Sequence, residues 1–95
     1  MAELPIVSRE AILAAVPVSD AIDRVRDAFV RHYEGSWAMP AKVYLDSSPH
    51  GDFRAMPARG GGLAMLKWIS SFPDNPRRGL PTVIGVLVLS DAETS

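Results

Sequence analysis

The most informative stretch for the fold of this chain is Leu63-Ala-Met-Leu-Lys-Trp-Ile-Ser70. Alternate residues of a strand point to opposite faces of a sheet, and both faces of this stretch are mainly apolar. A strand that is apolar on both sides belongs in the interior of a sheet. Gly60-Gly61-Gly62 precedes it and supplies a turn, so we expect this strand to pair with the strand before it.

Further strand signals lie on both sides of this central stretch. Residues 41–46 alternate apolar and polar side chains, and the turn sequence 47–52 leads to a return strand at residues 53–58. Pro57 predicts that this return strand lies at an edge of the sheet or ends there. The apolar run 82–90 predicts a last strand that other structure covers.

The N-terminal third predicts two helices. Ser8 suits the N-cap of a short helix that ends near Val16, and Pro17 separates it from the next. From Val18 the apolar residues recur every three or four positions, which predicts a helix with one buried face, and Gly35 fits its C-terminal cap. We therefore expect an α+β fold, with two N-terminal helices packed on an antiparallel sheet of about four strands and no Rossmann domain.

Composition limits the chain to one small domain. It has 95 residues, with 10 Lys and Arg against 11 Asp and Glu, and no cysteine. A chain of this length buries only about 60–65% of its unfolded surface, so it holds a single core. The absence of cysteine excludes disulfides, thiolate metal sites and a cysteine nucleophile. We expect residues 1–95 to form one truncated domain, because no strand follows the turn-like sequence 91–95.

Neither a nucleic acid nor a membrane is expected as a partner. The formal net charge of −1 gives no basic face for nucleic acid. The longest apolar run, residues 83–89, falls far short of the roughly 20 residues that a membrane span needs. The N-terminus lacks the basic region and apolar stretch of a secretory signal. We therefore expect a cytoplasmic location.

Lys67 is the most informative single residue. Its neighbours on the same strand face are Met65 and Ile69, and a lysine in such apolar surroundings needs a partner unless its ammonium extends to solvent. Lys42, on the polar face of an earlier strand, is by itself an ordinary surface residue. If the two strands lie close in one sheet, however, the two ammonium groups converge on an anion such as a carboxylate or phosphate.

Other candidate sites carry less chemistry. Gly60-Gly61-Gly62 leads into a strand and not into a helix, which favours a turn over a phosphate loop. His32 and His50 have no further ligand at metal spacing, so we predict no metal site. The loop 72–81 is long for a hairpin, and its Arg77-Arg78 pair either steers an anionic ligand or is simply solvated. No nucleophile-elbow pattern is present, and we predict no catalytic residue in this chain.

Three patterned segments stand out together. They are Met39-Pro40-Ala41-Lys42, then Gly51-Asp52-Phe53-Arg54-Ala55-Met56-Pro57-Ala58, and then Lys67-Trp68-Ile69-Ser70-Ser71-Phe72-Pro73-Asp74-Asn75-Pro76, which continues to Gly79-Leu80-Pro81-Thr82-Val83. They resemble the N-terminal part of the ornithine cyclodeaminase/mu-crystallin family, over about residues 13–94. The resemblance implies a substrate-binding and dimerisation domain built on an antiparallel sheet, which a Rossmann domain follows in the family.

The same resemblance implies an oxidoreductase or deaminase that uses NAD or NADP and acts, as a homodimer, on an amino acid or cyclic imino acid. It implies that Lys67 matches the family's substrate-binding lysine and that Thr82 matches the threonine that contacts the cofactor. Lys42 stands where the family usually has an arginine that grips the substrate carboxylate. Lysine keeps the charge but loses the bidentate fork.

The family's glycine-rich dinucleotide fingerprint and catalytic aspartate belong to its Rossmann domain, outside these 95 residues. We therefore do not expect catalysis by this chain alone, because the cofactor carries the hydride chemistry. Two other interpretations stay open. One is a non-catalytic dimerisation or interaction module, since an exposed apolar final strand tends to recruit a partner. The other is a decayed gene product without activity.

Overall fold

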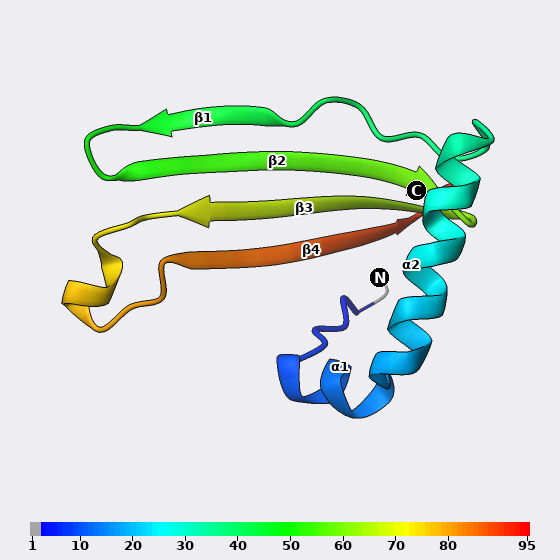
Figure 1. The fold of residues 1–95 in the computed structure, drawn as a ribbon, viewed down its shortest axis with the longest axis horizontal. Helices are drawn as coiled ribbons and strands as arrows, with labels where there is room; N and C mark the ends of the chain where they lie inside the picture. The colour runs from blue at the N-terminus through cyan, green and yellow to red at the C-terminus, as the bar shows by residue number, and fades with distance from the viewer. Residues whose placement is uncertain (1–2) are drawn as a thin grey trace.

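The computed structural model describes residues 3–95. The four strands form one antiparallel sheet in the order β1-β2-β3-β4, and helix α2 crosses one end of it (Figure 1). The α+β class is therefore confirmed. The elements in chain order are α1 (Arg9–Ala15), α2 (Val18–Tyr33), β1 (Val43–Ser47), β2 (Gly51–Gly60), β3 (Leu63–Ser71), the 3₁₀-helix η1 (Asn75–Arg78) and β4 (Val83–Asp91).

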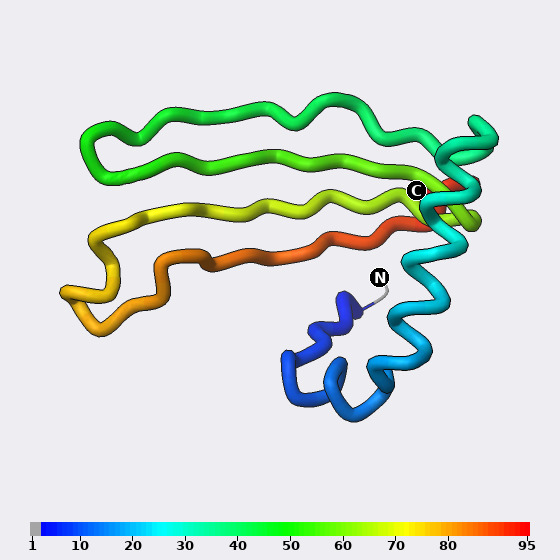
Figure 2. Tube along the Cα trace, in the orientation of Figure 1, coloured from blue at the N-terminus to red at the C-terminus, as the bar shows by residue number. Residues whose placement is uncertain are grey.

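Strand β3 is interior, as its two apolar faces predicted. Every residue of β3 is paired with β2 on one side and with β4 on the other. The turn from β2 into β3 uses Gly61 and Gly62, with φ of 60° and 81°, a backbone conformation that side chains other than glycine rarely adopt. The trace in Figure 2 shows the result, a meander in which successive strands lie side by side.

The prediction from Pro57 is wrong, because β2 is an interior strand that continues to Gly60. The backbone N–H and C=O of Arg59 bond to Ala38, on the side of β2 away from β3. Residues two apart in a strand point their backbone groups the same way, so the nitrogen of Pro57 also faces that side. The β1 ladder has already ended there, at the pair Val43 and Ala55. The missing donor therefore removes no ladder hydrogen bond.

The two helices begin and end where the sequence predicted. The backbone N–H of Ala11 donates to Ser8 Oγ at 3.1 Å, which caps α1, and Gly35 follows α2 with a φ of 83°. The predicted burial of the α2 apolar face is wrong, because Ile22 and Phe29 are 53% and 74% exposed. No Cα atom of either helix lies within 8 Å of a strand Cα, so most of that face is uncovered within residues 3–95.

Strand β4 is also uncovered, contrary to the prediction. It is an edge strand, and Val86 and Leu87, on opposite faces, are 59% and 55% exposed. Indeed, none of the described residues is fully buried. An apolar pattern indicates that a surface is covered in the folded protein. It does not identify the element or molecule that covers it. Among the described helices, none is long and apolar enough to cross a membrane.

Candidate functional site

The register of the sheet assigns each strand residue to one of two faces. Met56 lies directly opposite Lys67, so these two side chains share a face. Arg54, two residues before Met56, lies on that face as well and is paired with Tyr44 on β1. We call this surface the cation face. Its strand residues near Lys67 are Tyr44, Asp46, Asp52, Arg54, Met56, Ala58, Met65, Lys67, Ile69, Leu87 and Leu89.

Lys67 lies in the middle of β3 with apolar cross-strand neighbours. Met56 is opposite it on β2 and Leu87 is opposite it on β4, and the lysine is half-buried. Within residues 3–95 its ammonium forms no ion pair and no side-chain hydrogen bond. A charged group in partly apolar surroundings that has no counter-ion is available to an anionic ligand.

Lys42 comes directly before β1 and is exposed. The next residue, Val43, pairs with Ala55, so the nearest β2 neighbour of Lys42 is Met56, which in turn faces Lys67. Because adjacent strands are about 4.8 Å apart, the backbones of the two lysines are separated by about 10 Å. Two lysine side chains can span that distance around one small anion. The structure thus places both predicted lysines across the same part of the sheet.

Arg54 is a third cation that the sequence analysis missed. It lies on β2, between β3, which carries Lys67, and β1, which Lys42 directly precedes. It forms two hydrogen bonds to Asp52, with Nε to Oδ1 at 2.8 Å and Nη2 to Oδ2 at 3.4 Å. The hydrogen bond to Asp52 raises the pKa of Arg54, which favours the charged guanidinium. Arg54 is two residues from Met56, which predicts that the two side chains share a face of the strand. That this is the face of Lys67 follows only from the pairing of β2 with β3.

The ring of Tyr44 connects Arg54 to Lys42. The Cζ atom of Arg54 lies 5.1 Å from the ring centroid, and Nζ of Lys42 lies 5.3 Å from it. Both distances fall within the range of cation–π attraction. One aromatic side chain therefore contacts two of the three cations.

Thr82 does not join this cluster. It precedes β4 at the η1 end of the sheet, where its carbonyl accepts a 2.8 Å hydrogen bond from the backbone N–H of Phe72. Phe72 is five residues along the chain from Lys67, which is about 16 Å in an extended strand. The hydroxyl of Thr82 forms no hydrogen bond with any other described residue. The structure therefore separates the predicted cofactor contact from the predicted substrate contacts.

The opposite surface, the aromatic face, has different chemistry. The Phe53 and Trp68 rings stack there at 5.4 Å and 15°, and Phe72 meets Phe53 edge-on at 5.3 Å. Such pairs stabilise a sheet beyond the area they bury. The other apolar residues of this face are Val43, Leu45, Ala55, Pro57, Ala64, Leu66, Ile84, Val86 and Val88.

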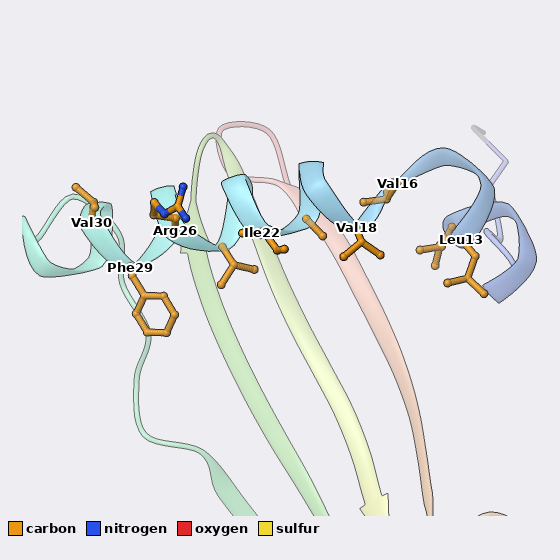
Figure 3. Close-up of a pocket in the computed structure, with 10 residues that line it drawn as sticks. Leu13, Val16, Val18, Ile22, Arg26, Phe29 and Val30 are labelled. Atoms are coloured by element: carbon orange, nitrogen blue, oxygen red, sulfur yellow. The ribbon is translucent and has the colours of Figure 1, made fainter.

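Two apolar hollows lie beside the helices and away from the cations. The larger, about 780 Å³, follows α1 and α2 and includes Leu13, Ile22 and Phe29 (Figure 3). The smaller, about 290 Å³, lies between α2 and the segment around Trp37 and Met39. Arg26 is the only charged residue that lines the larger hollow, which therefore fits apolar cover better than a polar reaction. His32 and Arg59 line the smaller one.

Comparison with known proteins gives consistent relatives. The family model described as the ornithine cyclodeaminase/mu-crystallin family matches residues 3–95. The chain is 41% identical over 92 residues to an alanine dehydrogenase of Archaeoglobus fulgidus, covering 97% of this chain and 28% of that protein. It is 29% identical over 91 residues to the nodulation efficiency protein NfeD of Rhizobium meliloti, covering 90% of this chain and 28% of that protein.

Solved structures agree with these matches. An archaeal alanine dehydrogenase dimer with bound NAD superposes with a TM-score of 0.87 at 42% identity, over 90% of this chain and 27% of that one. The Δ1-pyrroline-2-carboxylate reductase of Thermococcus litoralis, in complex with NADH and L-proline, gives 0.79 at 27% identity, over 83% and 25%. The chain spans little more than a quarter of the length of these relatives. With a family model that matches nearly its whole length, the chain belongs to the ornithine cyclodeaminase/mu-crystallin family.

Proposed function

We propose that this chain is the N-terminal, substrate-binding and dimerisation part of an NAD(P)-dependent oxidoreductase or deaminase, located in the cytoplasm, that acts on an amino acid or cyclic imino acid. Support comes from the relatives, one named for alanine and one solved with NADH and L-proline. The observation that carries the proposal is the cation face, where Arg54 and Lys67 lie on the neighbouring strands β2 and β3 and Lys42 directly precedes β1.

In this proposal the cation face binds the substrate carboxylate. Lys67 supplies a charge in partly apolar surroundings, where an ion pair is stronger than in open solvent. Lys42 adds a second charge at the rim, and Arg54 adds a guanidinium with the bidentate geometry that Lys42 lacks. The apolar side chains of Met56 and Leu87 beside Lys67 suit the hydrocarbon part of a small amino acid or imino acid.

The described residues do not fit a complete dinucleotide. A dinucleotide is held by a βαβ unit with a glycine-rich turn into a helix, whereas residues 3–95 form an antiparallel meander whose Gly60–Gly62 turn leads into a strand. The hydroxyl of Thr82 forms no hydrogen bond with another described residue, and it is the proposed contact to a nicotinamide cofactor that other residues would bind. We therefore assign this chain the binding and orientation of substrate and derive no transfer step from it.

Calorimetric titration tests the substrate role. L-alanine and L-proline are titrated into the wild-type chain, with L-alaninamide and L-prolinamide as matched ligands that lack the carboxylate. We expect binding of the acids alone, weakened by about tenfold or more in Lys67→Ala. Equal affinity of wild type and Lys67→Ala for a genuine ligand would contradict the proposal, as would equal binding of acid and amide.

A homodimer is proposed from the uncovered apolar surface. The aromatic face and the edge strand β4 expose more large apolar side chains than a soluble monomer usually does. The aromatic face is the one we propose for the interface, because the cation face must stay open to substrate. Light scattering is expected to give twice the chain mass, and a stable monomer at high concentration would overturn this part.

The same exposed surface favours a second candidate, a non-catalytic interaction module. In that case the chain would dimerise, or pair with a separate cofactor-binding chain, through β4 and the aromatic face. The titration separates the two candidates. A dimer that binds neither amino acid supports the module, and carboxylate-dependent binding supports the oxidoreductase part.

A further inference from the structure

The ion pair between Arg54 and Asp52 differs from the other ion pairs of the described chain. Its nitrogen and oxygen are 2.8 Å apart, and the two side chains are 33% and 31% exposed. The pairs Arg26–Asp23 and Arg31–Asp27 are longer, at 3.6 and 3.4 Å, and more than half exposed. Only the Arg54 pair has two hydrogen bonds. It is therefore the shortest and least exposed ion pair in residues 3–95, and it lies on the cation face.

The geometry leaves part of the guanidinium unused. Asp52 occupies the edge formed by Nε and Nη2, and the ring of Tyr44 lies 5.1 Å from Cζ. The Nη1 atom and the second hydrogen of Nη2 have no partner among the described residues. An arginine has five N–H donors, so it can hold one carboxylate along one edge and a second along the other.

We propose that Asp52 and Tyr44 are positioning residues, which fix the Arg54 guanidinium so that its unused Nη1–Nη2 edge receives the carboxylate of the amino acid or imino acid. This inference rests on the proposed function and adds to it the two residues that make the site directional. Lys42, on the same Tyr44 ring, and Lys67 supply charge without a fixed direction. Because the guanidinium is already oriented before the ligand binds, binding costs less entropy.

The sign of one mutational effect distinguishes positioning from simple charge. Asp52→Asn removes a negative charge next to the proposed anion site, so Coulomb attraction alone predicts tighter carboxylate binding. Positioning predicts weaker binding, because the fork loses its charged anchor. Asp46→Asn is the matched control. Asp46 pairs with Asp52 across β1 and β2, lies on the same face, and accepts its hydrogen bond from Ser48 and not from Arg54.

The experiment titrates the 95-residue chain with L-proline and L-prolinamide and follows the Arg54 side-chain Nε–H signal by NMR. We expect Asp52→Asn to weaken L-proline binding by about tenfold and to broaden or lose the Arg54 signal. Asp46→Asn is expected to leave affinity unchanged or slightly improved, within about twofold. Tyr44→Phe should retain both properties, because the ring remains, whereas Tyr44→Leu should weaken binding.

Each outcome bears on a definite claim. Equal or tighter binding by Asp52→Asn, with wild type binding normally, overturns the positioning inference and leaves the proposed function intact. Absence of carboxylate-dependent binding in wild type, with a sharp Arg54 signal, overturns the proposed function and with it the assigned ligand. Weakening by both Asp52→Asn and Asp46→Asn would assign the loss to general structural damage and also overturn the inference. Circular dichroism of each variant reports whether the sheet is retained.

Discussion

The two faces of the sheet use the same strands for different chemistry. The cation face carries Lys42, Arg54 and Lys67, whereas the aromatic face carries the cluster of Phe53, Trp68 and Phe72. Neither face is covered within residues 3–95. A two-residue alternation therefore separates a binding surface from a packing surface even in β3, whose two faces are both mainly apolar.

The largest expected effect comes from Trp68→Ala on the aromatic face. The substitution removes the ring that stacks on Phe53, and because Trp68 is 39% exposed we expect a loss of about 2–3 kcal/mol in the free energy of unfolding, below the value for a fully buried tryptophan. Urea unfolding followed by circular dichroism measures it. Trp68→Phe keeps an aromatic ring and is expected to lose less than half as much; equal losses would mean that stacking does not stabilise this face.

Gly51→Ala tests how closely the chain passes at the edge of the aromatic face. A Cβ atom at Gly51 would lie 2.1 Å from the carbonyl oxygen of Ser71 and about 3.0 Å from the Phe72 ring, so the backbone must shift. We expect a loss of about 2 kcal/mol in unfolding free energy. Gly62→Ala is a useful comparison, because there an added Cβ meets no atom and only the positive φ opposes it. An unchanged stability in Gly51→Ala would contradict the described pairing of β2 with β3.

Lys67→Met is the corresponding test of the cation face. Methionine fits the apolar neighbours Met56 and Leu87, so we expect unfolding stability to stay within about 0.5 kcal/mol while carboxylate affinity falls by about tenfold. Unfolding and calorimetry on the same sample give both values. A stability loss as large as that of Trp68→Ala would show that Lys67 is a packing residue. That result would contradict the assignment of binding to the cation face and packing to the aromatic face.

The smallest effect concerns Asp91, at the end of β4. Backbone N–H groups of Glu93 and Thr94 donate to its carboxylate and lower the pKa of Asp91. A lowered pKa in the folded state contributes stability above the unfolded-state pKa, and this contribution is lost as the pH falls through the folded value. The Tm of Asp91→Ala should therefore lie slightly below that of wild type at neutral pH, and the gap should close in acid. A gap that is constant with pH would exclude this cause.

Local pattern predicted most of the fold for physical reasons. The two apolar faces of residues 63–70 identified the interior strand, and Ser8, Pro17 and Gly35 marked the helix ends, because these signals depend on nearby residues. Pro57 misled because the cost of its missing N–H depends on which neighbour the nitrogen faces. That is a property of the register and of where β1 ends.

The candidate site was predicted only in part. Lys67 was recognisable because it interrupts an apolar strand face. In the sheet, Met56 lies between Lys67 and Lys42. Arg54 was missed because its face depends on pairing with a distant strand, and its partner Asp52 is recognisable only from geometry. The cover of α2, β4 and the two sheet faces could not be predicted either, since apolar side chains do not identify what packs on them.

The location of the carboxylate site is tested most directly by two neighbouring methyl groups of β2. Met56 lies on the cation face beside Lys67, and Ala55 lies on the aromatic face beside Trp68. In a methyl NMR titration with L-proline, we expect the Met56 signal to shift with a saturable profile while the Ala55 signal does not, and L-prolinamide to shift neither. A saturable shift at Ala55 without one at Met56 would contradict the assignment of carboxylate binding to the cation face.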